Sequence, residues 1–320
     1  RWERGDILIS PPVLISLQEL AESRVGSRES RVKNLLEKSQ KFDGIIDYLE
    51  LNSRHIVMPL KTPTLPPATH TNCFIVGRKE FIVIDAASAE IEEQEKLHNL
   101  VDELIERGGI CQEIIVSHLH NDHHGGEVAL QNHLREKHGL VVPIATHKLT
   151  AESLLQLKVD KFIEDGDVYN LQDEMGETFQ LQTLHTPGHA RGLLNFYDEE
   201  YGFLLSTDNV VGAGTVVIAP PEGDMSDYLN TLERLKNLPN LKHLCGSHGS
   251  AIFDAKTKIE EYISHRLRRE KQIIKLIEEG FTTPEELVEK IYVDLKPELV
   301  RLALKSVEAH LNKIKKDQTS

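Results

Sequence analysis

The sequence predicts an α/β protein with a two-layer sheet core, helices outside the sheets and a small helical module at the C-terminal end. Short apolar runs come first in pairs and then alternate with amphipathic stretches of helical period. After residue 254 the pattern is helical to the end of the chain. We therefore expect three parts: a helical N-terminal arm over residues 1–55, a main domain over residues 56–254, and a winged-helix-like helical domain over residues 255–320.

The composition is that of an ordinary globular protein, with 39% hydrophobic and 28% charged residues. The 37 basic residues against 51 acidic ones give a net charge of −14, which disfavours broad binding of nucleic acids. No run of about 18 apolar residues occurs, so neither a transmembrane helix nor a membrane partner is predicted. Three cysteines far apart in the chain indicate the cytoplasm or another reducing intracellular compartment.

Apolar residues recur at helical spacing in the N-terminal arm, for example at Leu14, Leu17 and Leu20 and again around residues 45–49. Two or three amphipathic helices are therefore expected there. The chain begins with Arg1 rather than Met, and the pattern from Trp2 to Pro12 weakly resembles the trailing end of a Nudix domain. The arm is interpreted as a remnant of another domain or, alternatively, as the contact surface of a homodimer.

The main domain begins with a loop rich in Pro and Thr over residues 61–71. Strands over residues 73–76 and 81–84 form a hairpin around a polar turn that begins with Gly77, and a helix over residues 89–107 ends at a Gly pair. The elements that follow are strand 113–116, helix 126–138, strand 140–145, helix 150–157, strands 178–184, 193–197 and 202–206, helix 225–238 and strand 242–245.

Three helices are predicted in the C-terminal domain, over residues 256–279, 285–291 and 298–316. Thr283-Pro284-Glu285 has the composition of an N-terminal helix cap, and Pro297 is suited to the first turn of the last helix. Helices of these lengths are typical of a winged-helix-like module.

One motif carries the chemistry: Ser117-His118-Leu119-His120-Asn121-Asp122-His123-His124-Gly125-Gly126, which lies directly between a predicted strand and a predicted helix. Because His118 and His120 are two residues apart on an extended segment, both imidazoles can point the same way. Asp122 and His123 follow in the turn. Four ligand-type side chains within six residues are more than one tetrahedral ion with an open position needs, which indicates two ions.

The remaining ligands are expected at distant strand ends, where loops gather. His189, Asp208 and His248 each follow a predicted strand. Together the seven residues suffice for two sites with three protein ligands each and a shared carboxylate. The other eleven of the 16 histidines are interpreted as ordinary side chains. His124 is expected to point away, and His147, His185 and His243 to lie near the site without binding metal.

The order HxHxDH, then a separate His, Asp and His, resembles the metallo-β-lactamase superfamily over about residues 56–254. The resemblance implies an αβ/βα sandwich with a zinc pair, two Zn²⁺ per chain. It assigns His118, His120 and His189 to one ion, Asp122, His123 and His248 to the other, and Asp208 to the bridge between them. Asp85 would support the site structurally. Manganese or iron also suits such His and Asp ligands.

The match can be narrowed within the superfamily. Residues 71–77 and 262–266 resemble the β-lactamase-like protein 2 type, which comprises mitochondrial endoribonucleases with a winged-helix-like C-terminal module. The architecture is also similar to that of carrier-protein thioesterases and, less closely, of glyoxalase II. Thr207 stands where the family usually has Gly, and Ala190-Arg191 follows His189 where Thr is common.

These observations predict a metal-dependent hydrolase. A water that bridges two cations has its pKa lowered toward neutrality, and Asp122 is the predicted catalytic residue that orients it. Single-stranded RNA is the substrate that the family resemblance favours, and seven basic against three acidic residues over 256–275 fit a basic groove. A solvated helix face explains those charges equally well. The alternative is a small-molecule ester or thioester substrate, because the same metal pair attacks a thioester carbonyl.

Overall fold

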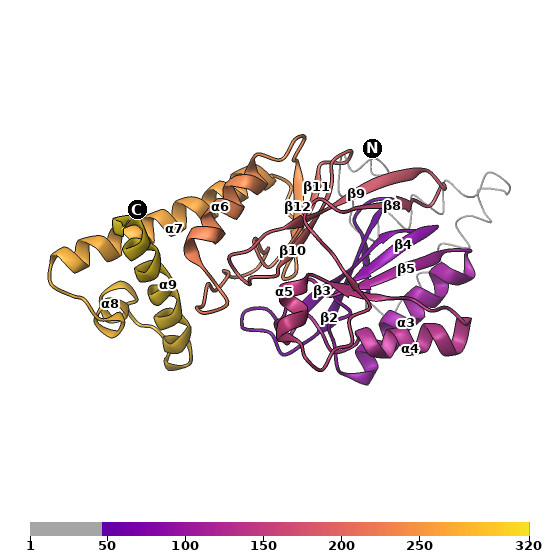
Figure 1. The fold of residues 1–320 in the computed structure, drawn as a ribbon, viewed down its shortest axis with the longest axis horizontal. Coiled ribbons are helices and arrows are strands. Elements are labelled where there is room, and N and C mark those ends of the chain that lie inside the picture. Colours follow the sequence, from indigo (N-terminus) through magenta and orange to yellow (C-terminus); the bar gives the residue numbers. More distant parts are fainter. Residues whose placement is uncertain (1–46, 320) are drawn as a thin grey trace, which may run out of the picture.

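A computed structural model of the protein describes residues 47–319. Within them the fold is a single mixed sheet of twelve strands with helices outside it (Figure 1). The strands are β1 (Leu49–Glu50), β2 (His55–Lys61), β3 (His70–Gly77), β4 (Glu80–Ile84), β5 (Ile110–Ile115), β6 (Ile144–Thr146), β7 (Lys161–Phe162), β8 (Val168–Gln172), β9 (Thr178–His185), β10 (Leu194–Asp198), β11 (Phe203–Thr207) and β12 (His243–Gly246). The helices are α3 (Ile91–Glu106), α4 (Glu127–His138), α5 (Lys148–Ser153), α6 (Met225–Lys236), α7 (Ala255–Glu278), α8 (Pro284–Ile291) and α9 (Val300–Thr319), with a 3₁₀ turn at Pro297–Leu299.

The sheet consists of two halves that meet at one residue pair, Glu80 of β4 with Gln172 of β8. The first half contains β1 to β7, with β4, β5, β6 and β7 parallel to one another. The second half contains β8 to β12 and is antiparallel except for β11 and β12. Because the halves are joined at a single pair, they can face each other as two layers.

Three apolar clusters give the domain its four layers. The first lies between the two halves of the sheet and includes Phe74, Ile84 and Phe196. The second fills the space between the first half and helices α3 and α4, and the third lies between the second half and helices α6 and α7. The helices therefore cover both outer faces (Figure 1). This arrangement confirms the predicted αβ/βα sandwich.

Helices α7, α8 and α9 form the C-terminal module, at the left of Figure 1. Their apolar faces make a separate small core around Ile273, Leu287 and Val307. Thr283 caps α8 as the sequence predicted: its hydroxyl accepts a hydrogen bond from the backbone N–H of Glu286, and the Glu286 carboxylate accepts one from that of Thr283. All three predicted helices are confirmed.

The N-terminal arm differs from its prediction where the structure describes it. Leu49–Glu50 is a strand that pairs with β2, and residues 51–54 are buried against the sheet, so the helix expected around residues 45–49 is wrong at its C-terminal end. The other expected arm helices lie outside residues 47–319. The division of the chain at residues 55 and 254 stays a prediction.

Strands β2, β7 and β8 were not predicted. Pro59 interrupts the strand pattern of β2, but β1 pairs only with Ile56 and Val57, so the outer edge of β2 is unpaired at Pro59 and no ladder hydrogen bond is lost there. Within residues 47–319, no helix combines the length and apolarity needed to cross a bilayer.

Candidate metal centre

The seven predicted ligand residues lie together at one edge of the sheets, although they come from four separate loops. His118, His120, Asp122 and His123 occupy the loop between β5 and α4. His189 follows β9, Asp208 follows β11, and His248 follows β12. The β-strand ends therefore bring together residues that are up to 130 positions apart, from His118 to His248.

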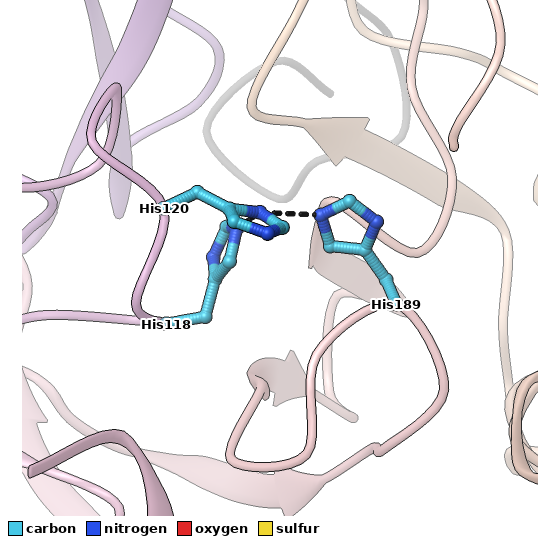
Figure 2. Close-up of side chains that lie close together, drawn as sticks. All are labelled: His118, His120 and His189. Carbon is cyan, nitrogen blue, oxygen red and sulfur yellow. Dashed lines mark hydrogen bonds between the residues drawn. The ribbon is translucent and has the colours of Figure 1, made fainter. Parts of the chain in front are cut away.

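His118, His120 and His189 form the first group, with the His120 ring lying between the other two (Figure 2). Nδ1 of His120 lies 3.0 Å from Nε2 of His118 and 2.9 Å from Nε2 of His189. The three ligand atoms are within 4.8 Å of one another. Three imidazole nitrogens at this spacing can share one transition-metal ion.

Asp122, His123 and His248 form the second group. Nε2 of His248 lies 3.5 Å from Oδ2 of Asp122, and Nε2 of His123 lies 3.9 Å from Oδ1 of the same carboxylate. One carboxylate oxygen and two imidazole nitrogens make a second donor set of the kind that zinc accepts.

The Asp208 carboxylate stands between the two groups. Its Oδ1 lies 3.6 Å from Nε2 of His123 and 3.5 Å from Nε2 of His248, whereas its Oδ2 lies 3.5 Å from Nε2 of His189. One oxygen therefore faces each group. This is the position that a bridging ligand requires.

Asp85 organises the motif from behind. Its carboxylate accepts hydrogen bonds from the Ser117 backbone N–H at 2.7 Å and from the Ser117 hydroxyl at 2.7 Å, and it contacts Nδ1 of His123 at 2.8 Å. Because Nδ1 of His123 is taken up in this way, Nε2 is the nitrogen turned toward the site. Asp85 thus has the supporting position that the resemblance implied.

Nδ1 is occupied in the same way in three other histidines, by partners that the sequence did not predict. Nδ1 of His118 contacts the Ser117 hydroxyl at 3.0 Å. Nδ1 of His189 contacts the Val217 carbonyl at 2.8 Å, and Nδ1 of His248 contacts the His70 carbonyl at 3.0 Å. Two of these three partners are backbone carbonyls, which carry no sequence signal, so they could be found only in the folded chain.

Burial sets the protonation state of the first group. Loss of solvent lowers the pKa of His118 well below its usual value, lowers that of His120 to about 3, and lowers that of His189. Neutral imidazole is the form that binds a metal. For His123, burial also lowers the pKa, but the carboxylates of Asp208 and Asp85 outweigh this effect and raise it.

The donor set fits a divalent pair. Nε2 of His123 and Oδ1 of Asp208 are buried, and neither has a hydrogen-bond partner among residues 47–319. Buried polar atoms without partners are costly, and metal coordination is one way to satisfy them. The imidazoles and carboxylates of the seven residues match the ligand preferences of zinc, manganese and iron.

Close backbone packing holds the motif loop in place. A Cβ on Gly126 would lie 2.4 Å from the carbonyl oxygen of Ala86, so only glycine allows α4 to begin this close to the segment after β4. Asp85 and Thr207 both have positive φ, 58° and 37°, a conformation that costs a side-chain-bearing residue energy. The usual glycine before the bridging Asp is therefore replaced by a strained Thr207, whose hydroxyl donates to the Leu194 carbonyl at 3.1 Å.

A groove of about 700 Å³ opens onto the site. Five of the seven predicted ligands line it, together with the loops 63–68 and 211–219. The far wall belongs to the C-terminal module and includes Leu295, Leu299 and Leu302. Much of the lining is apolar, so the groove suits a substrate with an apolar portion.

The histidines interpreted as ordinary near the motif have other contacts. The rings of His147 and His185 stack on each other at 4.0 Å, and Nδ1 of His243 contacts the Phe253 carbonyl at 2.9 Å. Neither these three nor His124 belongs to a ligand group in the described part of the chain.

Comparison with known proteins agrees with this geometry. Residues 66–248 match the family model of the metallo-β-lactamase superfamily, and residues 283–319 match the β-lactamase-associated winged-helix domain. The chain therefore belongs to the metallo-β-lactamase superfamily and is a metal-dependent hydrolase of that superfamily with a C-terminal winged-helix domain. Both resemblances inferred from the motifs are confirmed.

Two curated relatives indicate where the chain stands within the superfamily. The β-lactamase-like protein 2 homolog of Caenorhabditis elegans is 29% identical over 250 residues, which are 77% of this chain and 79% of the relative. The atrochrysone carboxyl ACP thioesterase of Pseudocercospora fijiensis is 28% identical over 64% of this chain and 55% of its own length. The match thus spans only about half of the thioesterase.

Solved structures show the same fold. A metallo-β-lactamase family protein from Thermus thermophilus superposes with a TM-score of 0.65 at 21% identity, over 84% of this chain and 95% of that one. A β-lactamase domain protein from Burkholderia ambifaria superposes with a TM-score of 0.71 at 17% identity, over 85% of this chain and 88% of that one.

Proposed function

We propose that the protein hydrolyses a thioester or ester that has an apolar acyl portion, using two divalent cations, preferably zinc. The observation that carries this proposal is the groove of about 700 Å³ with apolar walls, which leads from the C-terminal module to the seven clustered ligand residues. A pocket with apolar walls and a few polar groups at one end matches such a substrate.

His118, His120 and His189 would hold one ion, and Asp122, His123 and His248 the other, with Asp208 shared between them. When bound, such a pair activates water at neutral pH and polarises the carbonyl under attack. Asp122 lines the groove and is the catalytic residue: its carboxylate would orient the attacking water and accept its proton. The contacts of Asp85, Val217 and His70 keep the imidazoles turned toward the ions.

The basic residues near the groove give little support to an RNA substrate. Of the seven basic residues over 256–275, only Arg266 and Arg269 line the groove. Arg266 is buried and donates to the Val216 carbonyl at 2.5 Å, and the guanidinium of Arg269 lies 4.4 Å over the Tyr292 ring. Both guanidinium groups thus have contacts within the protein, although Nε of each is buried without a hydrogen-bond partner among the described residues. A phosphate backbone would meet only these two of the seven cations in the groove.

Two further features of the protein belong to the same proposal. Cys73, Cys111 and Cys245 are free and buried, which supports a reducing compartment such as the cytoplasm. We also propose that the protein forms a homodimer through the N-terminal arm. Most of that arm lies outside residues 47–319.

The deciding experiment compares two substrates on the zinc-loaded full chain. We expect metal-dependent hydrolysis of acyl-pantetheine thioesters, no cleavage of single-stranded RNA, and loss of activity with a chelator. Asp208→Ala should lower the rate by more than about 100-fold, because even residues behind metal ligands commonly contribute 10- to 100-fold. The same variant should retain less metal by elemental analysis.

Two outcomes would overturn this assignment. Full activity with normal metal content in Asp208→Ala would remove the bridging role. RNA cleavage that depends on metal and on Asp208, with thioesters left intact, would replace the thioester proposal by a ribonuclease.

A further inference from the structure

A second cluster of metal-ligand side chains lies away from the main site, between helices α3 and α4 on the outer face of the first half of the sheet. Asp102 comes from α3, and His133 and His138 come from α4. Their ligand atoms are within 4.8 Å of one another, as in the main site. None of these residues takes part in the centre described above.

The two imidazoles converge on one carboxylate oxygen. Oδ1 of Asp102 lies 2.9 Å from Nε2 of His133 and 2.6 Å from Nε2 of His138. These distances are comparable to the 2.9 and 3.0 Å between ligand nitrogens of the main site. Tetrahedral ligands of an ion with bonds of about 2.0–2.1 Å lie roughly 3.3–3.4 Å apart, so the two contacts would have to open by about 0.4 to 0.8 Å to accommodate it.

The surroundings suit an ion that enters from solvent. The side chain of Asp102 is 6% exposed, that of His138 14% and that of His133 23%, so the donors are sheltered but can be reached. His98, one helical turn before Asp102, stacks on the His133 ring at 4.2 Å. Its Nε2 is buried and has no hydrogen-bond partner within the described chain, which leaves a further nitrogen donor next to the group.

The Lys137 ammonium would compete with a metal ion for the Asp102 carboxylate. Its ammonium lies 2.7 Å from Oδ2 of Asp102, the oxygen that does not face the histidines. The Lys137 side chain is 49% exposed and can turn into solvent when a divalent ion neutralises the carboxylate.

We propose that Asp102, His133 and His138 form an additional site for a borderline divalent transition metal such as Zn²⁺, which links α3 to α4. Two imidazole nitrogens and one carboxylate oxygen favour such an ion over Mg²⁺ or Ca²⁺, which prefer oxygen ligands. Water would complete the coordination.

The test measures bound zinc per full-length chain after equilibrium dialysis against Zn²⁺, with Mg²⁺ as the control ion. We expect the wild type to hold one more Zn²⁺ per chain than the double variant His133→Ala/His138→Ala. This difference does not depend on how many ions the main site holds, so it separates the present proposal from the proposed function.

Two single variants guard against misfolding as an explanation. Asp102→Asn preserves the shape of the side chain and an oxygen that can accept from the imidazoles, and it should lose the extra ion while the circular dichroism spectrum is unchanged. Lys137→Met should bind the extra ion about tenfold more tightly, because a nearby positive charge is removed. Equal zinc content in the wild type and both ligand variants would show that the cluster is only a hydrogen-bonded group and would overturn the proposal.

Discussion

At the scale of single residues, the site depends on hydrogen bonds that fix four of the five imidazoles: those of His118, His123, His189 and His248. Asp85 is central, because it holds both Ser117 and His123. Its backbone has a positive φ of 58°. A residue held in a strained conformation at a functional site is retained because the surrounding contacts compensate for its cost.

We therefore expect Asp85→Asn to weaken metal binding by about 10- to 100-fold, the usual effect of removing a partner of a ligating histidine. Zinc titration against a competing chelator measures this. Asp173→Asn is the matched control: Asp173 is also buried, but it caps a remote turn by accepting from the Met175 and Glu177 backbone N–H groups. That variant should lose stability without losing zinc affinity, and an equal loss in both variants would exclude a specific role for Asp85.

At the scale of elements, the loop that carries His189 is held against helix α6. Gly188 has φ of 135°, and a Cβ there would lie 2.3 Å from Cα of Tyr228. The Gly188 carbonyl also accepts a hydrogen bond from the Asp224 backbone N–H, at the start of α6, at 2.8 Å. No side chain fits between this loop and the helix.

Gly188→Ala should consequently displace α6 or the loop, lowering both the stability and the zinc affinity of the first ligand group. Gly139→Ala is the control, because Gly139 also has positive φ, 69°, but a Cβ there meets nothing within 4 Å. The free energy of unfolding of the control should fall by only about 1–2 kcal/mol, which is the cost of a left-handed backbone conformation for a residue with a Cβ. Denaturant unfolding measures both variants, and equal losses would contradict the role of the close contact.

His310 of α9 lies beside α7 and makes the C-terminal module sensitive to acid. His310 is fully buried, and burial lowers its pKa to about 3. Nearby cationic groups add to the shift: Arg266, Arg269, Lys313 and His265. The Glu270 carboxylate lies 3.8 Å from Nδ1 of His310, too far for a hydrogen bond.

Because the folded pKa lies below the usual 6.5, the unfolded chain binds the proton first as the pH falls. Stability is thus complete above pH 6.5 and is lost progressively toward pH 3. Between pH 7.5 and 5.5 the loss from this group is about 1.4 kcal/mol. His310→Gln should be less sensitive to pH than the wild type by about this amount in urea unfolding, and identical pH profiles would contradict the prediction.

Most elements could be predicted because their periodicity is local. The helix expected over residues 126–138 is α4, and the strands at 178–184, 193–197 and 202–206 are β9, β10 and β11 within one residue at each end. Strand β8 was missed although its five residues alternate between exposed and buried positions, because the apolar Val168 stands at an exposed position and hides that alternation in the sequence. Its strand conformation depends on pairing with β9.

At the scale of the whole molecule, the groove exists because the winged-helix domain packs beside the candidate metal centre. Lys316 of α9 contacts the Asp224 carboxylate at the start of α6 at 2.5 Å, and Ala309 of α9 joins the apolar cluster of the main domain. The C-terminal module therefore supplies one wall of the site.

We expect Leu302→Gln, at that wall, to raise KM for long-chain acyl thioesters several-fold while short-chain substrates are little affected. The expectation follows from the loss of apolar contact at about 25 cal/mol per Å² of buried area. Arg301→Gln is the control, since Arg301 is exposed and does not line the groove. The same change in KM for short and long chains would show that the groove does not hold the acyl portion.

The sequence by itself determined the candidate ligand set, because the chemistry of two cations requires particular side chains and these stand at strand ends in a distinctive order. It also determined the helices of the C-terminal domain, since helical periodicity and capping are local. Only the tertiary structure decided which groups stand behind the ligands, that Arg266 and Arg269 are engaged within the protein, and that apolar walls surround the groove. The physical reason is that these features arise from contacts between segments far apart in the chain, as does the meeting of Asp102 with His133 and His138.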